Sequence, residues 1–238
     1  MPRLLGVDIP SDKPTVISLT YLYGVGKKIA RDLCHKAGID PQVRARNLRE
    51  DELARLAALL DKAGIPVVLL DRDLEAYPGR SRYDLVGIDN RRAGYAITAH
   101  LLKRGCQRLV FVGRPHSAPT VDARIAGFRE ALLDAGMDPR PAVIWRIDPA
   151  EAGDVKKLID KVRPDGVVCA NDFTAAHLMK SLGELGVNVP ADVRLVGIDD
   201  VKYASLLPVP LTTIHQPCVD IGAAADQPHR IKYRQLTR

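Results

Sequence analysis

The sequence of 238 residues contains no long uninterrupted apolar run. A helix that crosses a bilayer needs about 20 consecutive apolar residues, so we expect no membrane span. The first residues, MPRLLGVDIPSDK, include an early Arg but no apolar segment of the length that a signal peptide requires. We therefore expect a cytoplasmic protein without a membrane partner.

Cysteine is scarce, and its positions carry no metal or disulfide signature. The four cysteines lie far apart and form no C-x-x-C pair: Cys34, Cys106, Cys169 and Cys218. The six histidines also show no spacing typical of metal ligands. Both a disulfide framework and a zinc module are therefore disfavoured. We expect reduced thiols, and neither a metal ion nor a cofactor.

The common catalytic signatures are missing as well. A phosphate-binding P-loop that ended at Gly26 and Lys27 would need its first glycine where Tyr21 stands. No G-x-G-x-x-G follows a predicted strand, and H-E-x-x-H and G-x-S-x-G are absent. The adjacent carboxylates Asp199 and Asp200 would point to opposite faces of a strand, which disfavours a catalytic pair. We therefore expect a binding protein rather than an enzyme.

Positive charge is concentrated at the two ends of the chain. Residues 1–61 contain 10 Lys and Arg against 8 Asp and Glu, and residues 226–238 contain 4 against 1. The intervening residues 62–225 are nearly neutral, with 21 against 20. This distribution disfavours a nucleic-acid surface in the central part and places any polyanion contact at the ends.

From Pro66 onward, short apolar runs alternate with helical patterns. The runs predict strands at 67–70, 83–89, 108–113, 142–147, 166–171, 194–200 and 211–216. The patterns between them predict helices at 91–104, 121–135, 150–162 and 172–185. Strands that alternate with helices of this length imply crossover connections. We therefore predict an α/β fold with a parallel sheet flanked by helices.

Polar residues stand where the predicted strands end. They are Asp71, Asp89, Asn171 with Asp172, and Asp199 with Asp200. In open parallel sheets, ligands bind at the carboxyl ends of the strands, so these residues are candidates for a binding site. Asp and Asn also begin helices well, and helix capping is the alternative for each of them.

Residues 1–61 have a different pattern. A helix is predicted from Lys27 to Ala37, and a second one begins near Asn47 and runs through EDELARLAALLDK. We predict a small all-α module. The turn that contains Gly24 and Gly26 precedes the first helix, where backbone N–H groups can meet a phosphate beside the adjacent lysines. A tight turn between helices, which needs glycine for its backbone angles, is the alternative.

Residues 63–225 carry a series of motifs that resembles a known family. In order they are AGIPVVLLDRD, VGIDNRRAG, HLLKRGCQRLVFVG, ARIAGFREAL, VVCANDFTA, VPADVRLVGIDD and PVPLTTIHQP. The series resembles the effector domain of the lactose/galactose-repressor family, which is similar to periplasmic sugar-binding proteins. The resemblance implies a periplasmic-binding-protein-like fold, incomplete here, that binds a small polar effector and serves transcription regulation.

The same resemblance implies a set of effector-binding residues. Carried over by position, they are Asp89, Arg124, Asn171, Asp199 and Gln216. Carboxylate and amide groups pair with the hydroxyls of a sugar, and a guanidinium supplies a forked donor. We therefore expect a sugar or a similar molecule as the effector. Residues 1–61 do not match the headpiece that opens this family, which disfavours DNA binding.

Residues 1–61 resemble the N-terminal part of bacterial small-subunit ribosomal protein thirteen. The matching stretches are Gly6–Pro10, Ile17–Gly26, Gly38-Ile39 and the helix of Glu50 to Leu59. The resemblance implies contact with ribosomal RNA. The expected contact residues are Gly24, Gly26, Lys27, Lys28, Arg44 and Arg46.

The chain thus resembles a fusion of two truncated families. We predict a helical module at 1–62, an effector-binding domain at 63–225 and a basic tail at 226–238. The predicted function is non-catalytic binding of a sugar-like effector, and the alternative is binding of ribosomal RNA through the first module. The predicted strand at 67–70 has lost its neighbours in the family, so we expect an exposed edge that favours a homo-oligomer.

Overall fold

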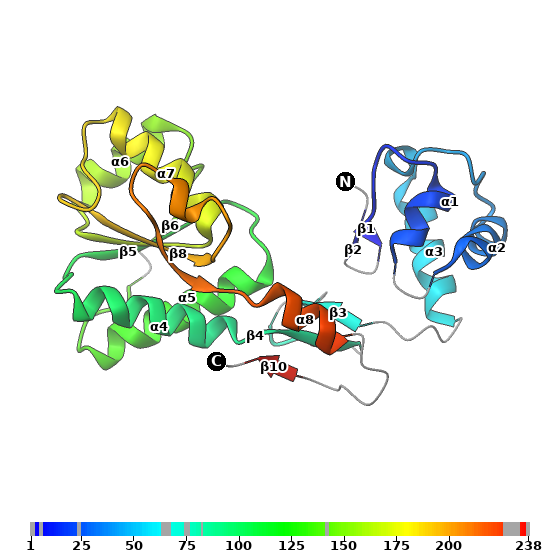
Figure 1. Ribbon diagram of the computed structural model, residues 1–238, viewed down its shortest axis with the longest axis horizontal. Helices are drawn as coiled ribbons and strands as arrows, with labels where there is room; N and C mark the ends of the chain where they lie inside the picture. Colours follow the sequence, from blue (N-terminus) through cyan, green and yellow to red (C-terminus); the bar gives the residue numbers. More distant parts are fainter. Residues whose placement is uncertain are drawn as a thin grey trace. The chain divides into compact units, whose positions relative to one another are not determined.

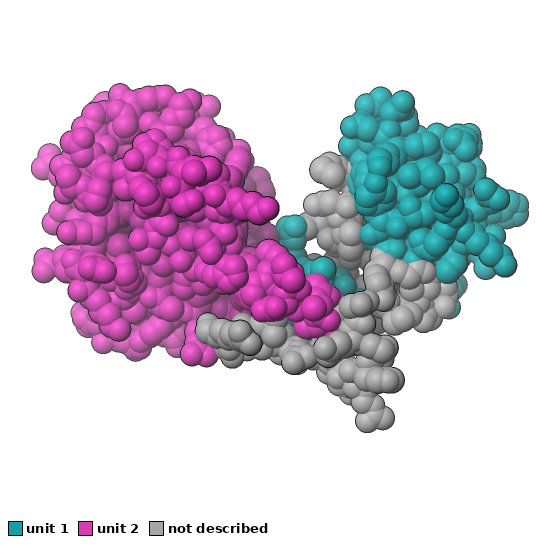
Figure 2. Space-filling model, viewed as in Figure 1, with its two compact units in different colours: residues 1–86, 228–233 teal, residues 87–227, 234–238 magenta. Residues whose placement is uncertain are grey.

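The computed structural model describes residues 3–4, 7–22, 25–62, 68–73, 77–81, 83–140, 143–225 and 234–236. The chain divides into two compact units, residues 1–86 with 228–233 and residues 87–227 with 234–238 (Figure 2). The domain boundary that the sequence predicts after residue 62 stays a prediction. In the described part of the chain, no helix has the length and apolar character needed to cross a membrane.

The first unit is mainly helical. It contains β1 (Arg3–Leu4), β2 (Val7–Asp8), α1 (Thr15–Ser18), η1 (Leu19–Tyr21), α2 (Lys27–Ala37), η2 (Ala45–Asn47), α3 (Glu50–Lys62) and β3 (Val68–Leu70). The predicted helix at 27–37 is confirmed. The second helix starts at Glu50 rather than near Asn47, because a separate turn of 3-10 helix precedes it. The antiparallel ribbon of β1 and β2 is an addition to the predicted all-α module.

Helices α2 and α3 bury one apolar stripe each. In α2, Ala30, Leu33, Cys34 and Ala37 recur at helical spacing and are buried. The helix ends at Gly38, whose φ of 68° is a conformation that suits glycine at this position. Leu56 and Leu60 of α3 join Leu4, Ile9, Leu19 and Leu33 in the same core.

Strand β3 lies at the edge of its sheet. It pairs in parallel with β4 (Asp84–Ile88), with Leu69 opposite Leu85. Leu69 is buried, whereas Leu70 is half exposed. An edge strand with an exposed leucine agrees with the expected exposed edge. The homo-oligomer itself stays a prediction, and residues 66 and 67 of this segment lie outside the described residues.

The second unit is an α/β domain. Its elements are α4 (Asn90–Lys103), β5 (Leu109–Gly113), α5 (Pro119–Asp134), β6 (Ile144–Arg146), α6 (Ala152–Val162), β7 (Gly166–Cys169), α7 (Asp172–Glu184), β8 (Arg194–Asp199), η4 (Ala204–Leu206), β9 (Thr212–His215), α8 (Cys218–Ala225) and β10 (Arg234–Leu236). Strands β6-β5-β7-β8-β9 form one parallel sheet in that order. The predicted parallel α/β fold is therefore confirmed.

Helices cover both faces of this sheet. Helices α4 and α5 lie on one face, and α6 and α7 lie on the other (Figure 1). The interior strand β5 is buried along its whole length. Its Phe111 packs against Phe128 of α5 with the ring centroids 5.7 Å apart. Burial on both faces explains why the strand sequences are continuous apolar runs rather than alternating patterns.

Helices α4 and α5 approach each other through two glycines. A Cβ atom at Gly94 would overlap the backbone carbonyl of Arg124, and one at Gly127 would overlap that of Arg91. Each glycine therefore faces the backbone of the other helix directly. This approach fixes the position of Arg124 relative to α4.

We expect Gly94→Ala and Gly127→Ala each to lower the free energy of unfolding of the second unit by about 1–3 kcal/mol, because the helices must separate. Urea denaturation followed by the fluorescence of Trp145 measures this, since the single tryptophan lies on β6 of this unit. The matched control is Gly183→Ala in α7, where a Cβ meets nothing within 4 Å. It should instead add about 0.5 kcal/mol. Equal effects at the three positions would contradict the close approach.

Candidate effector site

The candidate site is organised around the guanidinium of Arg124. This side chain extends from α5 and is only 4% exposed. Its Nε donates to Asn90 Oδ1 at 2.7 Å, and its Nη1 donates to the carbonyl of Ala170 at 2.7 Å. Its Nη2 lies 3.4 Å from Asp199 Oδ1. A buried guanidinium needs such partners, because an unpaired buried charge is costly.

These partners come from three elements that meet at the carboxyl edge of the sheet. Asn90 begins α4 directly after β4, Ala170 follows β7, and Asp199 ends β8. The edge is where ligands bind in open parallel sheets.

The predicted effector residues all lie at or beside this cluster. Arg124 and Asp199 are in contact. Asp89 precedes Asn90 and Asn171 follows Ala170, so each is the neighbour of a residue that Arg124 binds. The backbone N–H of Gln216 donates to the carbonyl of Asp199 at 3.2 Å. That these five residues bind an effector stays a prediction.

Asp89 and Asn171 cap helices. Asp89 Oδ1 accepts from the backbone N–H of Arg92 at 2.9 Å and caps α4. Asn171 Oδ1 accepts from the backbone N–H and the hydroxyl of Thr174, at 2.9 and 2.7 Å, and caps α7. Both side chains therefore act as helix caps, and their contact with an effector stays a prediction. Each cap uses one oxygen, and Asp89 Oδ2 and Asn171 Nδ2 make no hydrogen bond to the described residues.

A buried carboxylate that the predicted set omits supports the same edge. Asp172 is fully buried, and its Oδ1 accepts from the hydroxyl of Thr213 at 2.6 Å. Its Oδ2 accepts from the backbone N–H of Val201 at 3.0 Å. Gly197 leaves the space for this carboxylate, because a Cβ there would overlap Asp172 Oδ1. The sequence signal for Asp172 was its place at a strand end, beside Asn171.

The turn after β8 has an unusual backbone. Asp199 has φ 128° and Asp200 has φ 55°, which L residues rarely adopt. The N–H of Asp200 donates to the hydroxyl of Thr213 at 3.2 Å, which links the turn to Asp172. Asp200 Oδ2 also lies 2.8 Å from His215 Nδ1. Strained backbone that the surroundings fix in this way is found most often at functional sites.

The residues predicted to contact RNA lie in the first unit. Gly26 precedes α2, and Lys27 and Lys28 are exposed in its first turn. Gly24 lies outside the described residues. Two arginines bind one loop: Arg44 Nη1 donates to the carbonyl of Asp12 at 2.5 Å, and Arg46 Nη1 lies 3.1 Å from Asp12 Oδ1. Among the described residues, neither lysine contacts a carboxylate, whereas Arg46 is paired with Asp12.

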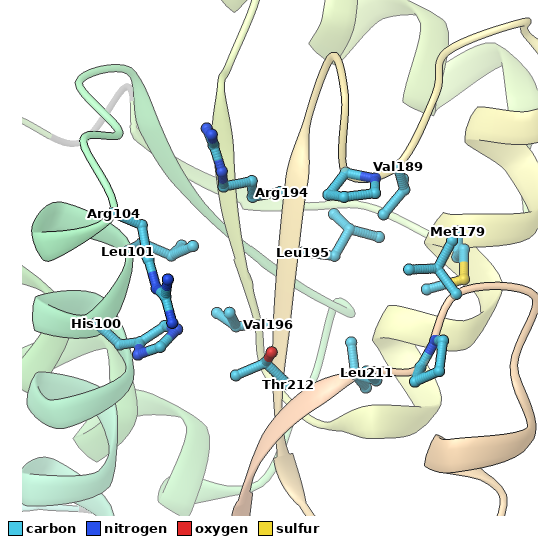
Figure 3. Close-up of a pocket in the computed structure, with 13 residues that line it drawn as sticks. His100, Leu101, Arg104, Met179, Val189, Arg194, Leu195, Val196, Leu211 and Thr212 are labelled. Atoms are coloured by element: carbon cyan, nitrogen blue, oxygen red, sulfur yellow. The ribbon is translucent and has the colours of Figure 1, made fainter.

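A separate pocket of about 270 Å³ lies at the opposite end of β8 (Figure 3). His100 of α4 and Arg104, which follows that helix, stand on one side of it, and Met179, Val189 and Leu211 stand on the other. Arg194, which begins β8, also lines it, whereas Asp199 ends that strand. None of the predicted effector residues lines this pocket. The carboxyl edge is the better candidate for the effector, because parallel sheets bind ligands there.

Two family models match the chain. Residues 98–227, more than half of the chain, match the periplasmic binding protein-like domain. Residues 3–93 match ribosomal protein S13/S18. Both resemblances predicted from the sequence are therefore confirmed, although the ribosomal match extends further than residue 61.

Individual relatives are repressors and regulators. The HTH-type transcriptional repressor PurR of Vibrio parahaemolyticus is 32% identical over 182 residues, which are 74% of this chain and 53% of that protein. The transcriptional regulator CelR in complex with cellobiose is 29% identical with a TM-score of 0.63, over 74% of this chain and 54% of that one. A LacI family regulator from Enterococcus faecium with bound ribose is 27% identical with a TM-score of 0.62, over 72% and 63%. The chain spans about half the length of the curated relatives it matches.

We expect Arg124→Ala to lower the free energy of unfolding of the second unit by about 3–5 kcal/mol, because it removes the buried donor that Asp199, Asn90 and the carbonyl of Ala170 share. Denaturation followed by Trp145 fluorescence measures the loss. Arg129→Ala is the matched control, since Arg129 is an exposed arginine of the same helix. It should change stability by no more than about 0.5 kcal/mol. Similar small losses in both variants would show that Arg124 does not organise the edge.

Proposed function

Because the chain belongs to the periplasmic binding protein-like domain family, we propose that its second unit is the effector-binding part of a sugar-responsive transcriptional regulator. The observation that carries the proposal is the buried guanidinium of Arg124, which joins Asn90 and Asp199 at the carboxyl edge of the sheet. The relatives support it, since they are repressors and regulators, and two of them are described with a bound sugar. Such regulators act in the cytoplasm, and we infer the same location for this chain.

The proposed binding chemistry uses groups that the fold already holds in place. Each sugar hydroxyl both donates and accepts a hydrogen bond. The side chain of Asp199 is 29% exposed and supplies an acceptor. Asn171 Nδ2 supplies a donor, and Asp89 Oδ2 and Gln216 extend the set along the same edge. Arg124 is too deeply buried to be the main contact surface, so its role is to position Asp199 and to offer Nη2 as an additional donor.

The proposed activity is binding without chemical conversion of the effector. A general acid and base would have to reach the reacting atoms of the ligand. Here the carboxylate of Asp172 is fully buried and bonded to Thr213 and Val201, and that of Asp199 faces Arg124. These groups are arranged to hold a neutral polar ligand. Residues 3–93 match ribosomal protein S13/S18, and the proposed function includes no DNA contact by them.

Isothermal titration of the full chain with ribose, glucose, cellobiose and guanine tests this function. We expect at least one sugar to bind and Asp199→Asn to weaken that binding by about 1.5–3 kcal/mol, the contribution of a hydrogen bond to a charged group. The matched control is Asp154→Asn on α6, whose exposed carboxylate pairs only with Lys157 among the described residues. Failure to bind any sugar, or equal affinity of Asp199→Asn and the parent, would contradict the proposal.

A second candidate function is RNA binding by the first unit. Two observations favour it: the match of residues 3–93 to ribosomal protein S13/S18, and the exposed Lys27 and Lys28 at the start of α2. The amino end of a helix attracts phosphate through its free N–H groups and its dipole. Lysines in that first turn add positive charge beside those groups. The proposed contact is with the phosphate backbone of a structured RNA.

We expect the full chain to bind a structured RNA weakly, with affinity that falls by a slope of about −2 in a log–log salt titration, because two lysines meet few phosphates. Lys27→Glu with Lys28→Glu should abolish this binding in a filter assay. The control is Lys156→Glu with Lys157→Glu, which reverses two adjacent lysines on α6. An affinity that does not depend on salt, or an equal loss in both double variants, would rule out the phosphate contact.

A further inference from the structure

Phe173 presents an exposed aromatic ring at the edge that holds the candidate effector site. It is the second residue of α7 and follows Asn171 and Asp172 directly. Its side chain is 47% exposed, although it lies beside the fully buried Asp172. The chain has only three phenylalanines, and the other two, Phe111 and Phe128, are fully buried in the core. Phe173 is therefore the one phenylalanine whose ring is open to a ligand at this edge.

Neighbouring side chains hold this ring in place. The imidazole of His177, one turn further along α7, packs against it with the ring centroids 4.4 Å apart and an interplanar angle of 60°. The guanidinium carbon of Arg114 lies 5.9 Å from its centroid. Contacts of both kinds favour a fixed orientation of the ring. A ring held in this way loses little freedom when a ligand packs on it.

Arg114 is itself fixed by an ion pair. Its Nη2 lies 3.1 Å from Asp148 Oδ2. The backbone N–H of Ala150, together with Arg114, holds the pKa of the Asp148 carboxyl below its usual range, so the carboxylate is charged at neutral pH. The charge of Arg114 is thus paired. The surroundings of the ring favour an uncharged ligand over an anion.

The side chains at this edge form a polar group around Arg124 and an aromatic group around Phe173. The order of the strands in the sheet separates the two groups. Arg124 binds residues at the ends of β7 and β8, which are neighbours. Phe173 instead approaches Arg114, which follows β5, and Arg114 pairs with Asp148, which follows β6. Neighbouring strands lie about 4.8 Å apart, so the two groups are separated by about 5–10 Å along the edge. A single sugar ring is about as wide as one strand spacing and cannot occupy both groups fully.

We propose that the effector is a disaccharide, with one ring hydrogen-bonded at Asp199 and Asn171 and the second ring packed by its apolar face on Phe173. The inference rests on the proposed sugar-binding function and names the class of sugar. A pyranose ring has one face of C–H groups that packs on an aromatic ring, while its hydroxyls point outward. The polar group alone would bind a monosaccharide. Phe173 adds a surface for a second ring and so makes the site selective for disaccharides over monosaccharides.

Titration calorimetry with matched sugar pairs tests the inference. The full chain is titrated with glucose against cellobiose and maltose, and with galactose against lactose. We expect at least one disaccharide to bind about tenfold more tightly than its monosaccharide. Phe173→Ala should remove that advantage and leave the monosaccharide affinity unchanged within about twofold. Phe173→Tyr retains the ring and should retain the preference, and Leu133→Ala, which truncates another exposed apolar side chain, should change neither affinity.

The outcomes separate this inference from the function on which it rests. A monosaccharide that binds as tightly as every disaccharide would overturn the inference and leave sugar binding intact. Equal weakening of both sugars by Phe173→Ala would also overturn it, because Phe173 would then act only on the structure of the site. Binding of no sugar by the parent chain would overturn the proposed function and the inference together. An unchanged unfolding temperature of Phe173→Ala confirms that the variant is folded during these measurements.

Discussion

The burial of one guanidinium constrains the whole carboxyl edge of the second unit. Arg124 is a charged side chain with 4% of its surface exposed, and its donors reach α4, the end of β7 and the end of β8. Such a group is tolerated only where every neighbour is placed correctly. The two glycines that bring α4 and α5 together contribute to this placement, because Gly94 faces the backbone of Arg124 itself. Gly197 meets a similar requirement for the carboxylate of Asp172.

The fold could be predicted from the sequence because it depends on local patterns. Continuous apolar runs marked the buried strands, and glycines marked helix ends such as that of α2. The bounds shifted where a local turn replaced a helix, as with η2 before α3, and the ribbon of β1 and β2 was too short to show a pattern. The candidate site was harder to predict. Arg124 and Asp199 came from a family resemblance, whereas the partners Asn90, Asp172 and Thr213 depend on contacts between distant segments that no periodicity reveals.

The two ends of β8 have different character. At its start, Arg194 lines a pocket with the basic side chains His100 and Arg104 and with several apolar ones. At its end, Asp199 turns with an unusual backbone and meets Arg124. Six residues thus separate the pocket from the candidate site. Because the strand between them is buried in a packed sheet, it holds its two ends in fixed positions.

The helix caps at Asp89 and Asn171 have a consequence for the thermodynamics of ligand capture. Asp89 is already held by one hydrogen bond to its helix and Asn171 by two, so each rotamer is fixed before any ligand arrives. A polar side chain that is free in solution loses rotamer entropy when it is immobilised, about 0.5–1.5 kcal/mol for each one. Here that cost has been met during folding. Association should therefore show a small unfavourable entropy for a polar site and a rate set by diffusion and orientation rather than by a slow rearrangement.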